Sequence, residues 1–280
     1  SMEAGEDFLL GYSPERIDPG NKEWTFKNTP KIVSGINQKS LKAISKFYDS
    51  IIDEVVEVSG TREAEMVKLI ENTYRQVNIA MVNELAILSN MLDIDIWEVV
   101  DAAKTKPFGF QSFRPGPGVG GHCIPIDPKY LSFKTRQIGQ PVRFVELAQE
   151  INNSMPSYVI SRISEIMNKK EILLKNSKIL ILGVAYKKDI GDTRESPAIN
   201  ILESLIDKSA EVSFYDPFVD ELKVNNESIS KEHDLENISN FDMVIIHTPH
   251  TSFNDIDFEN IKPLIFDTTG SFTISNAERI

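Results

Sequence analysis

The sequence predicts an α/β protein in three parts, and three observations indicate this. Residues 1–60 hold short strand-like runs around one amphipathic segment, as expected for the tail of an α/β domain. Residues 61–170 contain helical patterns only, beginning with one long helix, and predict a central all-helical dimerisation domain. Residues 171–280 alternate β-branched runs with a helical pattern, which predicts a C-terminal domain built on a parallel sheet.

The first part has three strand-like runs, at residues 8–12, 31–34 and 55–58. Between the last two lies an amphipathic segment at residues 40–52. Its apolar side chains recur at helical spacing: Leu41, Ile44, Phe47, Tyr48 and Ile51. This order of strands around a helix indicates the end of an α/β unit.

The central part begins with one long predicted helix over residues 61–92, which Thr61 can cap and which no Gly or Pro interrupts. Apolar residues are nearly continuous from residue 77 to residue 88. A helix that is apolar on most sides is buried by its neighbours. We therefore expect a homodimer in which this helix is shared across a two-fold axis.

Three further helical patterns follow, at residues 96–103, 128–137 and 142–168. The last contains Pro156, which lacks an N–H group and crowds the preceding turn. We expect this helix to be kinked or split at the proline.

The C-terminal part contains four short runs rich in β-branched residues, KILILGV, EVSFYDP, DMVIIHT and PLIFDTT. Residues 196–206 predict a helix, with Ser196 as its cap and Pro197 at its first position. Strands that alternate with helices indicate a parallel sheet covered on both faces, a Rossmann-like layer. The turn after the first run has only Gly183 and lacks G-x-G-x-x-G, so it is a weak dinucleotide fingerprint.

Composition excludes several classes of partner. The 280 residues carry a formal net charge of -12, which repels the phosphates of nucleic acids and anionic lipids. No run approaches the roughly 18 apolar residues of a membrane span, and no signal-peptide pattern is present. The single cysteine forms no internal disulfide, which fits a reducing compartment. We expect a cytoplasmic protein with no nucleic-acid or membrane partner and no metal site.

That cysteine, Cys123, lies in FRPGPGVGGHCIPIDPKYL, residues 113–131. The glycines of this stretch allow the backbone to approach a ligand closely, and its prolines limit the entropy lost on ordering. A predicted helix N-terminus nearby would lower the thiol pKa and favour a nucleophile. Asp127 would share a helical face with the cysteine if the helix began there, and His122 is expected to be structural. The alternatives are a plain connector and a small buried hydrophobic residue.

Four motifs in order resemble the UDP-glucose/GDP-mannose dehydrogenase family: YSPERIDPG, EAEMVKLIENTYRQVNIAMVNEL, PGPGVGGHCIPIDP and LGVAYKKDIGDTRESPA. The forms GGHCIPIDP and KPFGF are most similar to its UDP-N-acetylglucosamine and UDP-N-acetylmannosamine 6-dehydrogenases. The resemblance implies NAD-dependent oxidation of a sugar C6 alcohol to a uronic acid, through a cysteine-bound thiohemiacetal and thioester, for cell-surface polysaccharide precursors. UDP-glucose or GDP-mannose oxidation, and a non-catalytic UDP-sugar-binding protein, stay open as alternatives.

The resemblance implies five catalytic residues. Cys123 is the nucleophile that holds the aldehyde, a role that a four-electron oxidation requires. Lys68 and Asn72 lie four residues apart on the long helix and stabilise oxyanions. Asp127 assists proton transfer, and Glu15 acts on the water that hydrolyses the thioester.

Substrate and cofactor contacts are also implied. Gly118, Gly120, Gly121 and Lys187 are expected to contact the UDP-sugar, and Arg194 the NAD. Family members often carry an arginine two residues after the aspartate of the last strand, where this chain has Thr269.

The resemblance also implies an N-terminal domain whose Gly-rich turn holds the NAD pyrophosphate. No such turn lies in residues 1–60. The expectation is a fragment that lacks most of the NAD-binding domain and is inactive alone.

Overall fold

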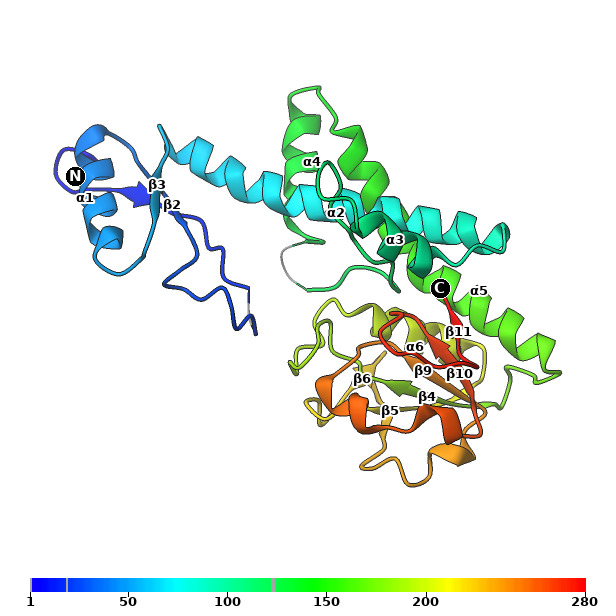
Figure 1. The fold of residues 1–280 in the computed structure, drawn as a ribbon. Coiled ribbons are helices and arrows are strands. Elements are labelled where there is room, and N and C mark those ends of the chain that lie inside the picture. The colour runs from blue at the N-terminus through cyan, green and yellow to red at the C-terminus, as the bar shows by residue number, and fades with distance from the viewer. Residues whose placement is uncertain (1, 19, 122–123) are drawn as a thin grey trace. The chain divides into compact units, whose positions relative to one another are not determined.

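The structure, a computed structural model, describes residues 2–18, 20–121 and 124–280 (Figure 1). The chain divides into two compact units, Ser1–Tyr74 and Arg75–Ile280, and the helix α2 (Thr61–Met91) passes from one into the other. The mixed α/β class predicted from the sequence is confirmed. The division into three domains at residues 60 and 170 stays a prediction.

The first unit contains a small sheet with the strand order β1-β2-β3. Strand β2 (Lys31–Gly35) is buried along its length, pairs antiparallel with β1 (Gly11–Tyr12) and parallel with β3 (Val55–Glu57). Helix α1 (Gln38–Asp49) covers β2, and its cap Asn37 accepts a hydrogen bond from the Ser40 N–H at 2.8 Å. Strand β1 has only two residues and is shorter than the predicted run at residues 8–12.

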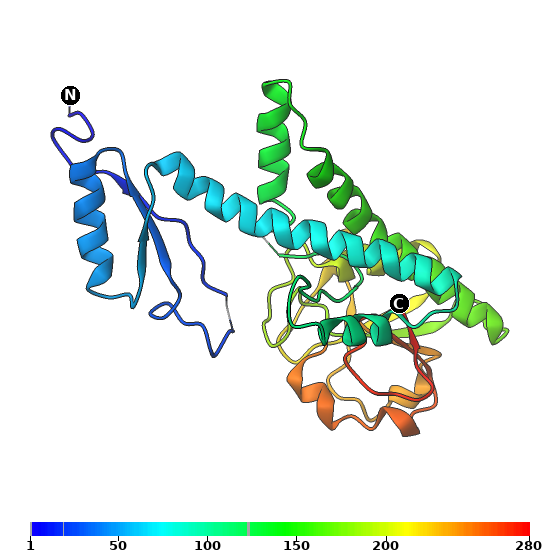
Figure 2. The ribbon, with the colours of Figure 1, turned by 45° about the horizontal axis from the view of Figure 1, so that its top comes forward.

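The helices α3 (Ile96–Lys104), α4 (Asp127–Gln137) and α5 (Arg143–Lys169) agree closely with their predicted ranges. Helices α4 and α5 form a hairpin (Figure 2). Within the described residues, no helix combines the length and the apolar composition that a bilayer span requires.

The helix was predicted to be kinked or split at Pro156, and it is not split, because α5 continues through that residue; the kink stays a prediction. Pro156 has no N–H to donate to the carbonyl of Asn152, one turn earlier. Pro156 and Asn152 are both buried. The glycine-rich loop packs against the Asn152 carbonyl oxygen, because a Cβ added to Gly118 would lie 3.3 Å from that oxygen. Gly118 thus packs against the carbonyl group that Pro156 leaves without its usual helical donor.

The sheet of the second unit has the order β11-β10-β9-β4-β5-β8, and every neighbouring pair is parallel. The strands are β4 (Lys178–Leu182), β5 (Glu211–Tyr215), β8 (Ser230–Lys231), β9 (Met243–Ile246), β10 (Leu264–Asp267) and β11 (Glu278–Arg279). A small hairpin, β6 (Lys223–Val224) with β7 (Glu227–Ser228), lies outside this sheet. This is the predicted Rossmann-like layer.

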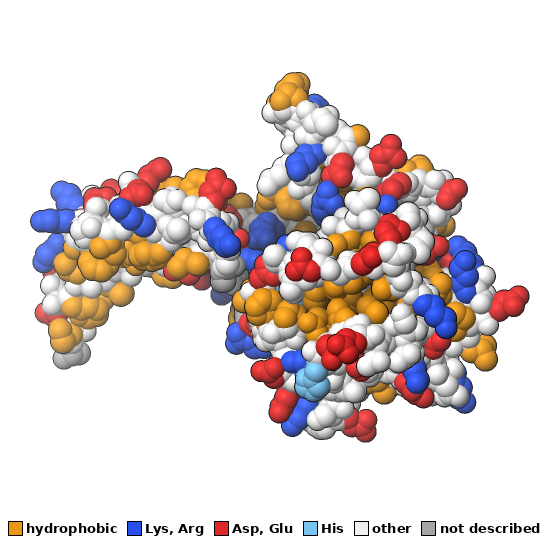
Figure 3. Space-filling model, turned by 60° about the horizontal axis from the view of Figure 1, so that its bottom comes forward, with side chains coloured by type: hydrophobic (Ala, Val, Ile, Leu, Met, Phe, Trp, Pro, Cys, Tyr) orange, Lys and Arg blue, Asp and Glu red, His pale blue; other side chains and the backbone are white. Residues whose placement is uncertain are grey.

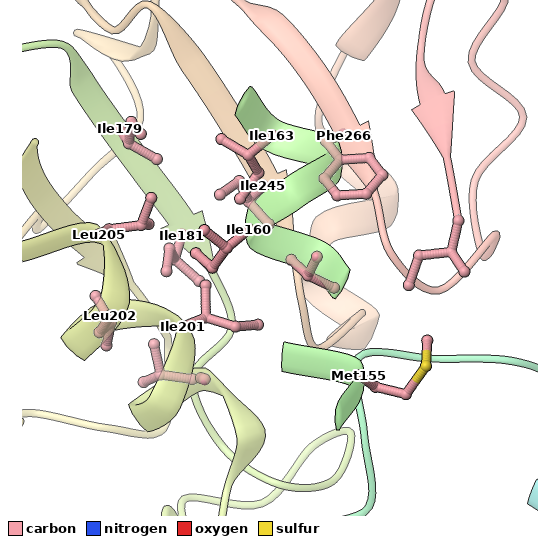
Figure 4. Packing of buried hydrophobic residues seen from close by; sticks show 14 of the residues in the cluster. Met155, Ile160, Ile163, Ile179, Ile181, Ile201, Leu202, Leu205, Ile245 and Phe266 are labelled. Carbon is pink, nitrogen blue, oxygen red and sulfur yellow. The ribbon is translucent and has the colours of Figure 1, made fainter. Parts of the chain in front are cut away.

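Both faces of this sheet are covered, as predicted. Ile179 and Ile181 of β4 pack in one core with α5 and with α6 (Pro197–Asp207), whose cap is Ser196 (Figure 4). The alternate residues of β4, Leu180 and Leu182, face a second core. Short 3-10 helices, Ile238–Asn240, Thr251–Asp255 and Phe258–Asn260, cover that face in place of long helices. Each fully buried aliphatic side chain contributes about 1.5–3 kcal/mol to these cores.

Candidate functional site

A hollow of about 280 Å³ lies at the carboxyl ends of β4 and β9. The chain leaves β4 through α6 toward β5, while β9 pairs on the opposite edge of β4, so the strand order reverses between β4 and β9. Parallel α/β sheets bind their ligands at such a reversal. The hollow is lined by three segments and the first residue of α6: Pro117, Gly118 and Gly120; Tyr186, Lys187 and Lys188; His247, Thr248 and Pro249; and Pro197. The structure therefore brings together Gly118, Gly120 and Lys187, three of the predicted substrate contacts.

The glycines of the loop are required where it meets the segment after β4. A Cβ on Gly120 would lie 2.8 Å from the Glu195 carbonyl oxygen and from the Tyr186 Cβ. Gly121 has φ +86°, and its Cβ would lie 2.9 Å from the Tyr186 ring. Gly121 is thus buried against Tyr186 rather than lining the hollow.

A chain of buried amides, named the amide relay here, holds the other side of the glycine loop. The Gly116 N–H donates to Asn83 Oδ1 at 2.9 Å, and Asn83 Nδ2 donates to Asn152 Oδ1 at 3.0 Å. Asn152 Nδ2 in turn donates to the Gln76 carbonyl at 3.2 Å. This relay was not predicted from the sequence. The available signal was Asn83 itself, an amide inside an apolar helical run, because a buried amide needs hydrogen-bond partners.

A buried histidine–aspartate pair holds the segment after β4. Asp216 Oδ2 accepts from the Val184 and Ala185 N–H groups, at 2.8 and 3.2 Å, and lies 3.0 Å from His250 Nε2. His250 Nδ1 accepts from the Asp189 N–H at 2.9 Å, so we assign the ring proton to Nε2, which donates to Asp216. Burial acts to raise the Asp216 pKa, but His250 and the backbone N–H groups outweigh it and hold the pKa below its usual range.

The first unit contains three of the predicted catalytic residues. Glu15 Oε1 accepts from the Arg16 and Ile17 N–H groups at 2.6 and 2.7 Å, and Glu15 Oε2 lies 3.3 Å from Lys31 Nζ. Partial burial acts to raise the Glu15 pKa, but the two N–H groups and Lys31 outweigh it and lower the pKa. Glu15 is thus an ionised carboxylate, able to accept a proton or orient a water molecule.

Arg16 connects the Glu15 loop to helix α2. Its guanidinium donates to the Pro30 carbonyl at 2.6 Å and pairs with Glu71 at 2.7 Å. Glu71 lies between Lys68, which is partly buried, and Asn72, which is 5% exposed. The first unit therefore anchors the Glu15 loop beside the helical turn that carries the predicted oxyanion-stabilising pair.

Other predicted residues are placed differently. Arg194 is absent from the lining of the hollow, and its exposed guanidinium forms two contacts with Asp192, at 2.9 and 2.7 Å. Asp127 is the first residue of α4, so this helix begins at Asp127 and not at position 123, where the expected shared helical face required it to begin. Cys123 and His122 lie outside the described residues.

The departure at Thr269 has a local role. The Thr269 N–H and hydroxyl both donate to Asp267 Oδ1, at 2.9 and 2.8 Å, and close the turn after β10. The threonine thus stabilises the turn at the position where an arginine was expected.

Two family models match this chain. Residues 62–154 match the central domain, and residues 180–274 the UDP binding domain, of the UDP-glucose/GDP-mannose dehydrogenase family. Together they cover more than half of the chain.

Similar proteins agree with these matches. The UDP-N-acetyl-D-mannosamine dehydrogenase of Methanococcus aeolicus is 37% identical over 94% of this chain and 58% of the relative. The UDP-N-acetyl-D-glucosamine 6-dehydrogenase of Salmonella typhi is 38% identical over 93% and 61%. The solved UDP-D-ManNAc dehydrogenase of Pyrococcus horikoshii has a TM-score of 0.85 at 30% identity, covering 98% of this chain and 64% of that one. The chain spans 58% to 61% of the length of these two sequence relatives.

Proposed function

The chain belongs to the UDP-glucose/GDP-mannose dehydrogenase family, and we propose that its protein oxidises a UDP-N-acetylhexosamine at C6 to the uronic acid with NAD. The observation that carries this proposal is the hollow at the strand reversal. There the glycines of the cysteine loop meet Lys187 of the UDP-binding domain, so the substrate would lie between the loop and the sheet. The names of the sequence relatives support an N-acetylhexosamine over glucose.

The proposed chemistry assigns the catalytic work to five residues of the chain. The Cys123 thiolate adds to the aldehyde carbon, and the carbonyl electron pair moves to oxygen as an oxyanion that Lys68 and Asn72 stabilise. Asp127 assists proton transfer at the reacting oxygen. Water then displaces the thiolate from the thioester, and Glu15 accepts the proton of that water.

NAD, when bound, accepts the hydride in each oxidation step. The residues of this chain do not by themselves fit the cofactor. Residues 1–60 contain no Gly-rich turn for a pyrophosphate, and Arg194, the predicted cofactor contact, is held by Asp192. We therefore propose that residues 1–280 alone do not reduce NAD.

We also propose a homodimer formed through α2. Met81, Leu85 and Leu88 of this helix are 43% to 49% exposed, and an apolar hollow of about 120 Å³ lies between α2 and α3. Figure 3 shows how apolar side chains lie among charged ones on one face of each unit. A second copy would cover Met81, Leu85 and Leu88 of α2. Light scattering at micromolar concentration measures this directly, and a monomer would contradict the proposal.

The product keeps its bond between C1 and the phosphate, so it remains an activated sugar donor. We propose that it supplies cytoplasmic precursors for cell-surface polysaccharides, because transfer of an activated uronic acid is the reaction that consumes such a product.

The test uses the intact protein that contains this chain. NADH formation is followed with UDP-N-acetylglucosamine, UDP-N-acetylmannosamine, UDP-glucose and GDP-mannose, and the product is identified by mass. We expect two NADH per uronic acid with an N-acetylhexosamine. Binding of a UDP-sugar without turnover would instead favour a non-catalytic UDP-sugar-binding protein.

A further inference from the structure

The lysines of the hollow lie on a short run of residues 186–188, named the lysine run here, which ends in a turn of unusual backbone. All three residues of the run line the hollow. Asp189, which comes next, has φ +60°, in the left-handed region that residues other than glycine seldom adopt. Such a conformation persists where the surrounding contacts hold it. The placement of the lysine run therefore depends on what holds Asp189.

Three hydrogen bonds hold Asp189, and all of them come from the segment after β9. The Asp189 N–H donates to His250 Nδ1 at 2.9 Å. Its carboxylate accepts from the Thr251 N–H at 2.7 Å and from the Thr251 hydroxyl at 2.5 Å. These partners directly follow residues 247–249, which line the hollow themselves. Asp189 thus joins the two segments that line the hollow after β4 and β9.

His250 is the buried part of this junction. Its ring is fully buried and lies 5.0 Å from the Phe218 ring, measured between ring centroids. Nε2 of the ring lies 3.0 Å from Asp216 Oδ2, which also accepts from the Ala185 N–H at 3.2 Å. Ala185 directly precedes the lysine run, and Asp189 directly follows it. The buried histidine–aspartate pair therefore anchors the run at both ends.

We propose that His250 is a positioning residue, which holds the lysine run so that Lys187 and Lys188 present their positive charges to the diphosphate of the nucleotide sugar. This inference rests on the proposed function. Consecutive side chains of an extended segment point to opposite sides. Both lysines line one hollow, and the chain bends and turns at residues 185–189 instead of continuing as a strand. Loss of the anchor at Asp189 is therefore expected to weaken binding of the diphosphate, which charged donors hold.

The test is calorimetric titration of UDP into variants of the intact protein that contains this chain, with thermal melting of each variant. In His250→Gln, the amide nitrogen can reach Asp216 in place of Nε2, while the acceptor for the Asp189 N–H is lost. In His250→Asn, the amide oxygen can replace Nδ1 as that acceptor, while the contact with Asp216 is lost. The exposed His233→Gln is the matched control.

Affinity and stability are expected to separate in these variants. We expect His250→Gln to bind UDP about tenfold more weakly than the wild type, and His250→Asn to bind within about threefold although it melts at a lower temperature. His233→Gln is expected to match the wild type in both measurements. In a Lys187→Ala background, His250→Gln is expected to change affinity by less than about twofold, because His250 acts through the lysine run.

Three results would overturn the inference alone: UDP affinity of His250→Gln within about twofold of the wild type, equal losses of affinity in His250→Gln and His250→Asn, or an undiminished tenfold loss in the Lys187→Ala background. A wild-type protein that does not bind UDP would contradict the proposed function, and this inference with it.

If the His250 variants do not fold, two substitutions of the exposed Asp189 take their place. Asp189→Ala and Asp189→Asn remove the same negative charge, but asparagine tolerates the left-handed conformation and keeps an acceptor for Thr251. We expect Asp189→Asn to bind UDP about fivefold more tightly than Asp189→Ala. Equal affinities of these two variants would overturn the inference.

Discussion

The two units hold their candidate functional groups by different means. In Ser1–Tyr74, the Glu15 and Glu71 side chains are 59% and 35% exposed, and their partners are cations. In Arg75–Ile280, the hollow is held by groups that are fully buried, Asp216 and His250 among them. The first unit thus uses partly exposed ion pairs, in which Lys31 is buried and Glu15 is exposed, and the second uses a buried hydrogen-bonded framework.

This difference predicts different responses of stability to substitution in the two units. Exposed ion pairs contribute about 0–1 kcal/mol, whereas removing one partner of a buried pair costs about 3–5 kcal/mol. Substitutions in the first unit are therefore expected to change rate with little effect on stability. Substitutions in the support of the hollow are expected to change stability first.

The largest expected effect comes from Cys123→Ser in the intact protein. A serine hydroxyl has a much higher pKa than a thiol, so the thioester route closes and acid formation falls by several orders of magnitude. UDP-sugar affinity, measured by calorimetry, stays nearly unchanged. A variant that oxidised a supplied UDP-sugar aldehyde at a near-normal rate would show that the cysteine is structural.

Lys68→Ala is expected to act on rate by roughly 100- to 1000-fold, the usual loss when an oxyanion donor is removed. Single-turnover kinetics of the intact protein, beside calorimetric titration of UDP-sugar, separates rate from affinity. Arg62→Ala, an exposed cation on the same helix, is the control and is expected to have the wild-type rate. A tenfold loss of affinity at an unchanged rate would move Lys68 from chemistry to substrate binding.

Elements with local signals could be predicted from the sequence. Helix α2 is uninterrupted by Gly or Pro, and α6 has a serine cap and a proline at its first position, so both were located closely. Strands such as β8 and β11 are only two residues long and are defined by their pairing with β5 and β10. Such pairing depends on tertiary structure and leaves no pattern in a short segment.

The candidate site follows the same rule. The glycine loop and Lys187 could be predicted as site residues because their motifs are continuous in the sequence and resemble a known family. The amide relay, His247 and the Asp216–His250 pair were missed, because each joins residues from separate elements. A single buried histidine or asparagine in the sequence does not identify its partner.

Asn83→Ala tests the buried framework. The change leaves the Gly116 N–H and Asn152 Oδ1 without their partner, and we expect the free energy of unfolding to fall by about 2–3 kcal/mol in urea titration. Asn153→Ala, an exposed asparagine on α5 next to Asn152, is the matched control. A loss no larger than that of the control would show that the relay does not hold the glycine loop.

The smallest effect on the free energy of unfolding is expected from Glu15→Gln. The pH dependence of this effect sharpens the comparison between the two units. The folded-state pKa of Glu15 lies below its ordinary value, because the Ile17 and Arg16 N–H groups and Lys31 outweigh partial burial. Ionised Glu15 therefore contributes stability above its unfolded-state pKa, near 4.5, and this contribution is lost as pH falls through the lower folded-state pKa. Since the side chain is 59% exposed, the loss on substitution is expected to stay below about 1 kcal/mol at pH 7.

Urea unfolding at pH 7 and pH 3 measures this loss of stability in Glu15→Gln, with the exposed Glu23→Gln as control. We expect a small difference from wild type at pH 7 that narrows at pH 3. A loss of 3 kcal/mol or more at pH 7 would mean that the first unit holds Glu15 as rigidly as the second holds its hollow.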